Sequence, residues 1–530
     1  MGVNGAKKTL IIGGSLLELV VVFSSPDIVE SVTLGFPDSA DFVNKHAEEA
    51  SRILTDNLKL RPDQSPFTKT MAAFSKNFRR IAVLDQLSVH PSLNLHEAVA
   101  GIFESLNRLN AWEMQNLRQD PKHLQTIDVD LANVVLCTKS GSPAMNRRGM
   151  LGLTVDYWRE YHLLATSTEP SHAKWIEESE TTWSILIGCA PIRQSDITVV
   201  TNPVRVSDKW IGANIQKMPL PDDIHAGPMI DWLEPVNTFV TTDAPKPGSS
   251  TDALDAAAPL LVPRLPEVVF AATFDPPINI PFSLCEELRR LGCGLPGVDV
   301  APNYDTLIFP VPPGKPYDPS EPRIITHNHK VVVKLRGGQF SQSYRSSLLV
   351  YKPIYGRALS ELTFSHPQQL INMLPYFRQY VFLSNVLEKS FKDRKPVHSA
   401  ARDMESLSSS SSTTKTTTAA RDTSFFNYSK FAISLGALTN ESVKLDVTLT
   451  VHPVPQLQIV FPCHSRTGTV VLEIRENGAV HVVSQDVIDE NTVDDQGKRP
   501  KVEKLGLLLQ LTEDLGMWCE YIRTRWTQRN

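Results

Sequence analysis

The length, composition and charge of the chain limit what kind of protein it can be. Its 530 residues, with 41% apolar side chains, are enough for roughly three or four folded units with buried cores. The 53 basic and 58 acidic residues leave a net charge of -5, which disfavours direct binding of nucleic acid. The six cysteines form no CxxC pair, which argues against zinc ribbons and disulfide scaffolds.

The sequence predicts no membrane segment. The only apolar run near the start, residues 16–23, is interrupted by Glu18 and is far shorter than the roughly 20 residues that cross a bilayer. It also lacks the small-residue cleavage site of a signal peptide. We expect this run to be a β-strand.

The first part of the chain predicts a β-hairpin followed by helices. The run at 16–23 alternates in polarity, and after a turn a second apolar run ends at Phe36. Helical spacing then predicts one helix over 42–58 and two longer helices over 71–84 and 95–109. The last two are expected to form an antiparallel pair.

The middle of the chain predicts strands, a linker and an amphipathic helix. From about Val134 the pattern turns to β, with strands at 151–155, 183–187 and 204–206. A Pro-, Ala-, Asp- and Ser-rich stretch then predicts a linker or long loop. After it a strand at 268–274, which the sequence DPPINIP is expected to interrupt, leads to a helix that Gly292 ends.

One order of elements occurs three times. A strand, a phenylalanine, a proline-containing loop and a helix follow one another at GFPD, TFDPP and TFSHP, which begin at residues 35, 273 and 363. We interpret them as related α+β modules, although strand-loop-helix is common and chance can produce the likeness.

The last part of the chain predicts a disordered loop, strands and a closing helix. Residues 406–420 are rich in Ser and Thr and nearly lack apolar side chains, so their ordering entropy is not offset. Strands at 445–451, 457–461 and 470–474 follow, and Asn477-Gly478 predicts a tight hairpin. A terminal helix has its apolar face at Leu508, Leu511, Leu515, Trp518, Ile522 and Trp526.

These elements predict an α+β, multidomain protein with repeated strand–Pro loop–helix modules, antiparallel sheets and an N-terminal helical pair. We divide the chain into six regions. The first three are a β-hairpin plus helical region (1–135), a mainly β region (136–243) and a linker or long loop (244–266). The last three are a strand–Pro–helix α+β region (267–405), a disordered Ser/Thr-rich loop (406–423) and a C-terminal β-meander plus terminal helix (424–530).

The motifs that usually reveal an active site are not found in this sequence. The start, MGVNGAKKT, has glycines but lacks the spacing of a phosphate loop, and we interpret it as an exposed tail. Cys463 beside His464 and Arg466 resembles a thiolate between basic neighbours. A turn at the end of a strand is the favoured interpretation, so no catalytic residue and no cofactor are predicted.

Two further patterns have a structural and a functional interpretation. His327 and His329 lie at alternate positions of a predicted strand and could clamp a metal, but no third ligand is near. Two surface histidines are the favoured interpretation, and no metal is predicted. Residues 505–509 match LxxLL, a spacing that can dock in a partner's groove. The same stripe carries Trp518 and Trp526, which favours a role in the chain's own core.

Several segments, in order along the chain, resemble the Mediator subunit 1 family. LLELVVVFSSPDIVESVTLGFPDSADFVNKHAEEA is similar to the family's strand-hairpin-helix, and NRRGMLGLTVDYW to its glycine-containing strand. VRVSDKWIG and IDWLEP resemble fungal members. The same order continues through EVVFAATFDPPINIPFSLCEELRRLG, THNHKVVVKLRGG, ELTFSHPQQLINMLPYFRQYVFLSNVL and LDVTLTVHPVPQLQIVF.

The resemblance implies a non-enzymatic nuclear coactivator subunit in the middle module of Mediator. It implies contacts with other middle-module subunits, such as subunits 4 and 9, and with transcription activators, and an indirect link to RNA polymerase II. The net charge and the lack of a membrane segment predict no direct nucleic-acid or membrane binding. Animal members carry receptor-binding LxxLL boxes in a long tail, and the corresponding function is not carried over. They also have helices before the first strand, which leaves open whether an N-terminal piece is lacking here.

We expect the exposed helices between residues 67 and 117 to pack on neighbouring subunits, because their apolar stripes are long. The candidate interface residues are Phe74, Phe78, Phe103 and Leu106. Two alternatives remain: a cysteine-dependent hydrolase using Cys463 and His464, and a nucleic-acid-binding β-protein. Reactivity of the thiol would favour the first, and a steep salt dependence of DNA binding the second.

Overall fold

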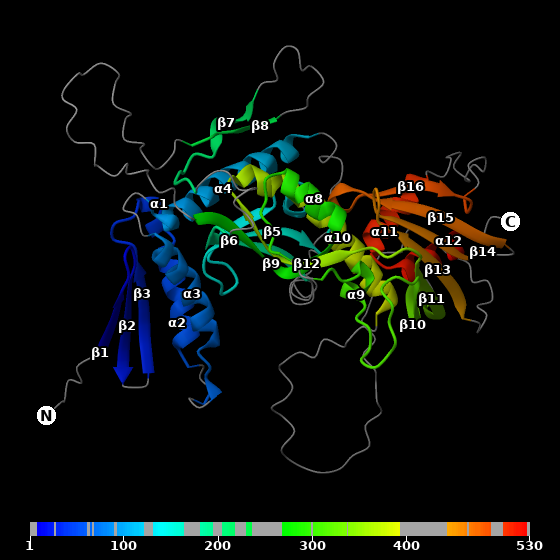
Figure 1. Cartoon of the computed structure of the whole chain (residues 1–530), viewed down its shortest axis with the longest axis horizontal. Coiled ribbons are helices and arrows are strands. Elements are labelled where there is room, and N and C mark those ends of the chain that lie inside the picture. Colours follow the sequence, from blue (N-terminus) through cyan, green and yellow to red (C-terminus); the bar gives the residue numbers. More distant parts are fainter. Residues whose placement is uncertain are drawn as a thin grey trace, which may run out of the picture. The chain divides into compact units, whose positions relative to one another are not determined.

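The computed structural model divides the chain into two compact units, each with its own sheets and helices (Figure 1). The first unit comprises Met1–Ile278, Phe282–Val300 and Ala358–Arg378; the second comprises Asn279–Pro281, Ala301–Arg357 and Gln379–Asn530. The structure describes residues 8–25, 28–60, 64–65, 68–88, 93–120, 131–163, 181–193, 204–217, 229–235, 268–297, 300–335, 338–392, 442–463, 466–488 and 502–526. The predicted loops at 244–266 and 406–423 lie outside these residues, and the division into six regions stays a prediction.

Helices and largely antiparallel sheets occur in both units, which confirms the predicted α+β class. Among the described residues, no helix is long and apolar enough to cross a membrane.

The first unit begins with a three-stranded antiparallel sheet in the order β1-β2-β3. Its strands are β1 (Lys8–Gly13), β2 (Glu18–Ser25) and β3 (Ile28–Gly35), so the predicted hairpin is confirmed. Lys8 and Thr9 are exposed as predicted, but their assignment to a tail is wrong, since both belong to β1. Their backbone pairs with Phe23 and Val22 of β2, because the β-branched run that follows continues the ladder.

Four helices follow the sheet, and one of them covers its inner face. They are α1 (Asp41–Asn44), α2 (Ala47–Leu58), α3 (Ala72–Leu87) and α4 (Leu95–Gln119). The predicted helix over 42–58 is thus two helices, while the N-terminal helical pair is confirmed. Leu19, Val32 and Leu34 of the sheet share a buried cluster with Ile53 and Leu54 of α2. The blue elements of Figure 1 show α2 and α3 running beside the sheet.

A five-stranded sheet forms the rest of the first unit's framework, in the order β12-β9-β6-β5-β4. Its strands in chain order are β4 (Ser142–Met145), β5 (Leu153–Arg159), β6 (Thr182–Pro191), β9 (Val268–Pro281) and β12 (Gly356–Phe364). β5 is buried on both faces from Leu153 to Trp158. A separate pair, β7 (Ile211–Lys217) and β8 (Met229–Trp232), forms a small sheet.

Three predictions for this region are wrong. The sequence DPPINIP does not interrupt β9, which continues to Pro281. Proline lacks an N–H for pairing, but the prolines of this sequence lie beyond Asp275, where the pairing of β9 with β6 ends. Val204 belongs to no strand, although its N–H donates to the carbonyl of Val268 (3.4 Å). The β pattern from about Val134 begins instead with helix α6 (Leu131–Thr138), where tertiary contacts override local β propensity.

Helices follow two of these strands directly. Helix α8 (Phe282–Arg290) follows β9, and Gly292, at φ +85°, ends its last turn as predicted. Helix α10 (Pro367–Phe391) follows β12. Strand and helix therefore follow one another at all three segments, with helices of 4, 9 and 25 residues. The predicted proline loop is wrong at the second segment, because the prolines of TFDPP lie inside β9 and α8 begins directly after that strand. Their common origin stays a hypothesis.

The second unit contains a six-stranded sheet in the order β10-β11-β13-β14-β15-β16. The strands are β10 (Arg323–Leu335), β11 (Gly338–Val350), β13 (Val443–Thr450), β14 (Gln456–Cys463), β15 (Arg466–Ile474) and β16 (Val480–Gln485). Only β11 and β13 pair in parallel within this sheet. The predicted hairpin at Asn477-Gly478 joins β15 to β16 through the short turn η3 (Glu476–Gly478).

Short helices complete the second unit. They are α9 (Tyr304–Ile308), α11 (Glu503–Thr512) and α12 (Leu515–Trp526). The prediction of one terminal helix is wrong, because Glu513 adopts a left-handed conformation (φ 48°) between α11 and α12. The left-handed conformation at the end of a helix is usually adopted by glycine. Here the buried carboxylate of Glu513 forms an ion pair with Lys389 of α10 (2.6 Å), which holds the residue in place.

A fully buried arginine joins three elements of the first unit. Arg378 of α10 donates from Nε to the carbonyl of Tyr157 (2.9 Å) and from Nη2 to the carbonyls of Leu136 (2.9 Å) and Lys139 (2.5 Å). Burial lowers the pKa of Arg378 to about 10, so the guanidinium remains charged at neutral pH. The nearby Glu113, whose pKa burial raises, contributes a favourable charge interaction.

We expect the substitution Arg378→Met to destabilise the first unit by about 3–5 kcal/mol, because it leaves buried carbonyls without a donor. The measurement is the thermal or urea unfolding midpoint of the full chain. Arg290→Met, in an exposed position of α8, should leave that midpoint unchanged. Equal midpoints for the Arg378 variant and the wild type would contradict the role given to this guanidinium.

A buried histidine makes the same unit sensitive to acid. His96, in the first turn of α4, packs against Phe36 in a tilted arrangement, with 4.7 Å between ring centroids. Burial lowers its pKa from 6.5 to about 4, although Asp85 acts in the opposite direction. Asp85 itself accepts from the backbone N–H groups of Ser15 and Leu16, and so fixes the turn between β1 and β2 to α3.

We expect stability to fall as the pH falls through this window. Between pH 6.5 and 4 the unfolded chain binds a proton that the folded chain, with the lower pKa of His96, does not bind. A tenfold difference in proton affinity between the two states corresponds to about 1.4 kcal/mol, so unfolding at pH 5 should cost roughly 2 kcal/mol less than at pH 7 because of this group. His96→Leu should reduce the pH dependence of urea unfolding by that amount.

Candidate functional site

The four candidate interface residues lie on α3 and α4 and differ in exposure. Phe74 and Phe78 of α3 are half-buried, stack on each other with 5.7 Å between centroids, and pack against the cluster beneath the first sheet. Phe103 and Leu106 of α4 are buried within the chain itself. Only Phe74 and Phe78 thus present surface to a partner, and the interface stays a prediction.

The thiol that suggested a hydrolase is poorly suited to be a nucleophile. Cys463 is buried at the end of β14. Burial raises the pKa of its thiol, against the opposing effects of Arg466 and Arg523, whereas a reactive thiolate needs a lowered pKa. His464 lies outside the described residues. All six cysteines are buried and none forms a disulfide.

The histidine pair and the LxxLL segment both make contacts within the chain. His327 and His329 stack on each other (5.2 Å), and His329 stacks on Tyr344 (5.8 Å), so they are half-buried neighbours and not isolated surface groups. In the part of the chain that the structure describes, no group of three His, Cys, Asp or Glu could hold a metal. Leu505 and Leu509 are buried, which confirms their assignment to the core.

A group of polar contacts surrounds the loop between β4 and β5, residues 146–152, which we name the arginine loop. Its sequence is NRRGMLG. Asn146 closes the loop: its N–H donates to the carbonyl of Gly152, and its Oδ1 accepts from the Gly152 N–H, both at 3.0 Å. Asn146, Arg148, Gly149 and Gly152 all have positive φ values. For Arg148 (φ 54°) this conformation is strained.

Side chains of helix α3 hold the backbone of the arginine loop. The buried Asn77 donates from Nδ2 to the carbonyl of Gly149 (2.8 Å) and accepts at Oδ1 from the N–H of Leu151 (3.1 Å). Leu151 is fully buried in the cluster beneath the first sheet. Arg80, one turn further along α3, reaches Asn77 Oδ1 (3.1 Å) and Met150 Sδ (3.9 Å). The loop is therefore fixed by side-chain amides and by burial.

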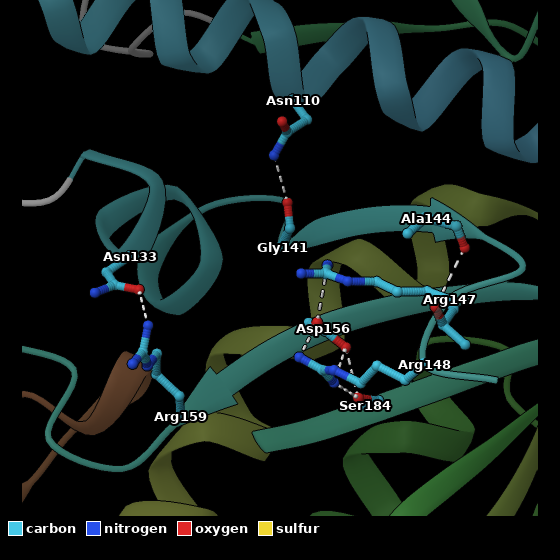
Figure 2. A network of polar contacts seen from close by, with 10 residues as sticks. Asn110, Asn133, Gly141, Ala144, Arg147, Arg148, Asp156, Arg159 and Ser184 are labelled. Carbon is cyan, nitrogen blue, oxygen red and sulfur yellow. Dashed lines mark hydrogen bonds and ion pairs between the residues drawn. The ribbon is translucent and has the colours of Figure 1, made fainter. Parts of the chain in front are cut away.

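Two arginines of this loop share one buried carboxylate (Figure 2). Asp156 of β5 is only 2% exposed, and its Oδ2 lies 3.1 Å from Arg147 Nη1 and 2.9 Å from Arg148 Nη2. Its Oδ1 accepts from Arg148 Nη1 (3.2 Å) and from the hydroxyl of Ser184 on β6 (2.6 Å). The two guanidinium groups are each 44% exposed. The cluster can present N–H donors to a ligand.

The sequence alone does not single out these residues. NRRGMLG is recognisable only as a glycine-containing segment before a strand, because the carboxylate partner lies eight and nine positions away and Ser184 lies on another strand. The pairing of Asp156 with Ser184 across β5 and β6 brings them together. Two adjacent arginines in a glycine turn, followed by an aspartate in an otherwise apolar strand, are the available signal.

The family comparison covers most of this framework. Residues 2–392 match the family model described as Mediator of RNA polymerase II transcription subunit 1. The chain belongs to the Mediator subunit 1 family. It is therefore a subunit of the Mediator coactivator complex, which regulates transcription. No individual curated protein matches the chain.

The match to the Mediator subunit 1 family includes all of the first unit's described elements and ends at the close of α10. Strands β13–β16 and helices α11 and α12 lie beyond it, so the resemblance of residues 445–461 to the family stays a prediction. The arginine loop and Asp156 lie inside the matched region.

We expect Asp156→Asn to destabilise this Mediator subunit 1 chain by about 1–3 kcal/mol, because the half-exposed arginines lose their shared anion while the amide stays buried. Urea unfolding measures the effect. Asp56→Asn removes a carboxylate that is 63% exposed and 3.7 Å from Arg52, and should have no measurable effect. Similar losses in both variants would contradict a specific role of Asp156.

Proposed function

We propose that the protein is a non-enzymatic scaffold in the middle module of Mediator, in the nucleus, where it links gene-specific activators indirectly to RNA polymerase II. Other middle-module subunits, such as subunits 4 and 9, are its proposed neighbours. Membership of the Mediator subunit 1 family supports an assembly role. Buried polar groups such as Arg378 and Asp156 hold the backbone and the arginine loop in place, which also supports an assembly role.

We place the contact with neighbouring subunits at the start of α3. Met71 is 52% exposed, and Ala72 and Ala73 beside it are exposed as well. The stacked pair Phe74 and Phe78 continues this apolar surface along the helix. Aromatic side chains that are partly exposed beside apolar neighbours are typical of the centre of a protein interface.

We expect Met71→Asp, alone and together with Phe74→Lys, to release the chain from the complex, because a charge at a buried interface loses its hydration. The measurement is affinity purification of the tagged chain, with mass spectrometry of the co-purified middle-module subunits. Met71 occupies the N-cap of α3, where aspartate is well tolerated, so the single variant should keep the wild-type unfolding midpoint.

Two further variants separate loss of contact from loss of fold. Phe103→Asp should lower the unfolding midpoint strongly, because Phe103 is buried. Leu507→Asp changes an apolar residue of α11 that is 49% exposed and should leave both stability and co-purification unchanged. Retention of a stable Met71→Asp, Phe74→Lys chain in Mediator would sink this surface as the interface.

A further inference from the structure

The arginine loop carries more positive charge than its framework needs. Arg148 contacts both oxygens of Asp156 and lies 3.4 Å from the hydroxyl of Ser184. Arg147 makes one side-chain contact among the described residues, through Nη1 to Asp156. One carboxylate therefore serves two guanidinium groups. The side chain of Arg147 is 44% exposed, so a ligand can reach it.

The neighbouring charges leave this excess in place. Arg80 of α3 reaches Met150 of the loop, and the exposed Asp275 of β9 interacts with Arg80. Asp275 stands opposite Ser184 in the β6–β9 ladder. The three arginines and two aspartates of this cluster therefore sum to one positive charge, on a chain whose total charge is -5.

The loop is also held ready in one conformation. Asn77 and Asn146 fix its backbone, and Leu151 anchors it in the core. The positive φ of Arg148 costs roughly 1 kcal/mol that glycine or asparagine at this position would avoid. Strained residues that are held by their surroundings occur preferentially at binding sites. A rigid donor set also loses less entropy when a ligand binds.

We propose that the arginine loop is a docking site for an acidic segment of a partner protein, with Arg147 as the residue that binds the carboxylate and Arg148 as the residue that positions it. Guanidinium donors in a fixed arrangement bind carboxylates in a bidentate manner. An acidic protein segment is favoured over nucleic acid because the surplus is one charge, whereas nucleic-acid sites neutralise several phosphates.

This inference is tested on the isolated full-length chain, so its failure leaves the proposed role in Mediator intact. The probe is a short fluorescent peptide of alternating aspartate and glycine, and fluorescence anisotropy at low ionic strength measures its binding. Arg147→Ala should weaken binding about fivefold or more and leave the unfolding midpoint unchanged, because Arg148, Asp156 and Ser184 keep their contacts. Arg148→Ala should weaken binding and also lower the midpoint.

Arg289→Ala is the matched control. Arg289 is an exposed arginine of α8 in the same unit, and its substitution should leave binding unchanged. The same peptide with asparagine in place of aspartate should not bind. The proposal is overturned if the wild-type chain does not bind the aspartate peptide, or if the Arg147 and Arg289 variants bind it equally. It is also overturned if only a phosphoserine peptide binds, or if duplex DNA binds with the same dependence on Arg147.

Discussion

The first unit depends on the burial of one positive charge. The guanidinium of Arg378 has no access to water, so its hydration must be replaced by the carbonyl oxygens of β5 and of the end of α6. Those carbonyls at a helix C-terminus carry partial negative charge and lack partners within the helix. The carbonyls and the guanidinium therefore satisfy one another, and the buried cation fixes α6, α10 and β5 together.

The arginine loop follows the same logic with one difference. Asn77 satisfies backbone groups of the loop, and Arg148 satisfies the buried carboxylate of Asp156, which would otherwise be costly to bury. Arg147, in contrast, is not needed to neutralise Asp156, because Arg148 already does so with two contacts. Polar groups in this fold thus hold surfaces rigid, and the charge left over is available to a partner. Such preorganisation suits a protein whose family assembles into a large complex.

The sequence predicts this fold best where local pattern and tertiary environment agree. Helices α3 and α4 and the β2–β3 hairpin follow clear periodicity. Strand β1 escapes prediction because its first residues are polar and follow a glycine-rich start. The break at Glu513 escapes it because no glycine marks the position, and Lys389, which pairs with Glu513, is far away in the sequence. The candidate site is hidden for the same reason: the meaning of Arg147 and Arg148 depends on Asp156 and Ser184, which only the sheet brings together.

The burial of every cysteine has a practical consequence. Burial raises the pKa of the Cys189 and Cys519 thiols, and that of Cys293 to about 12, so these three thiols are protonated at neutral pH, and all six cysteines are covered. A cysteine introduced at an exposed position of α3 or β16 would then be the one site that a maleimide dye modifies quickly. Distances between such dyes would report conformational changes of this subunit inside an assembled complex, without prior replacement of its native cysteines.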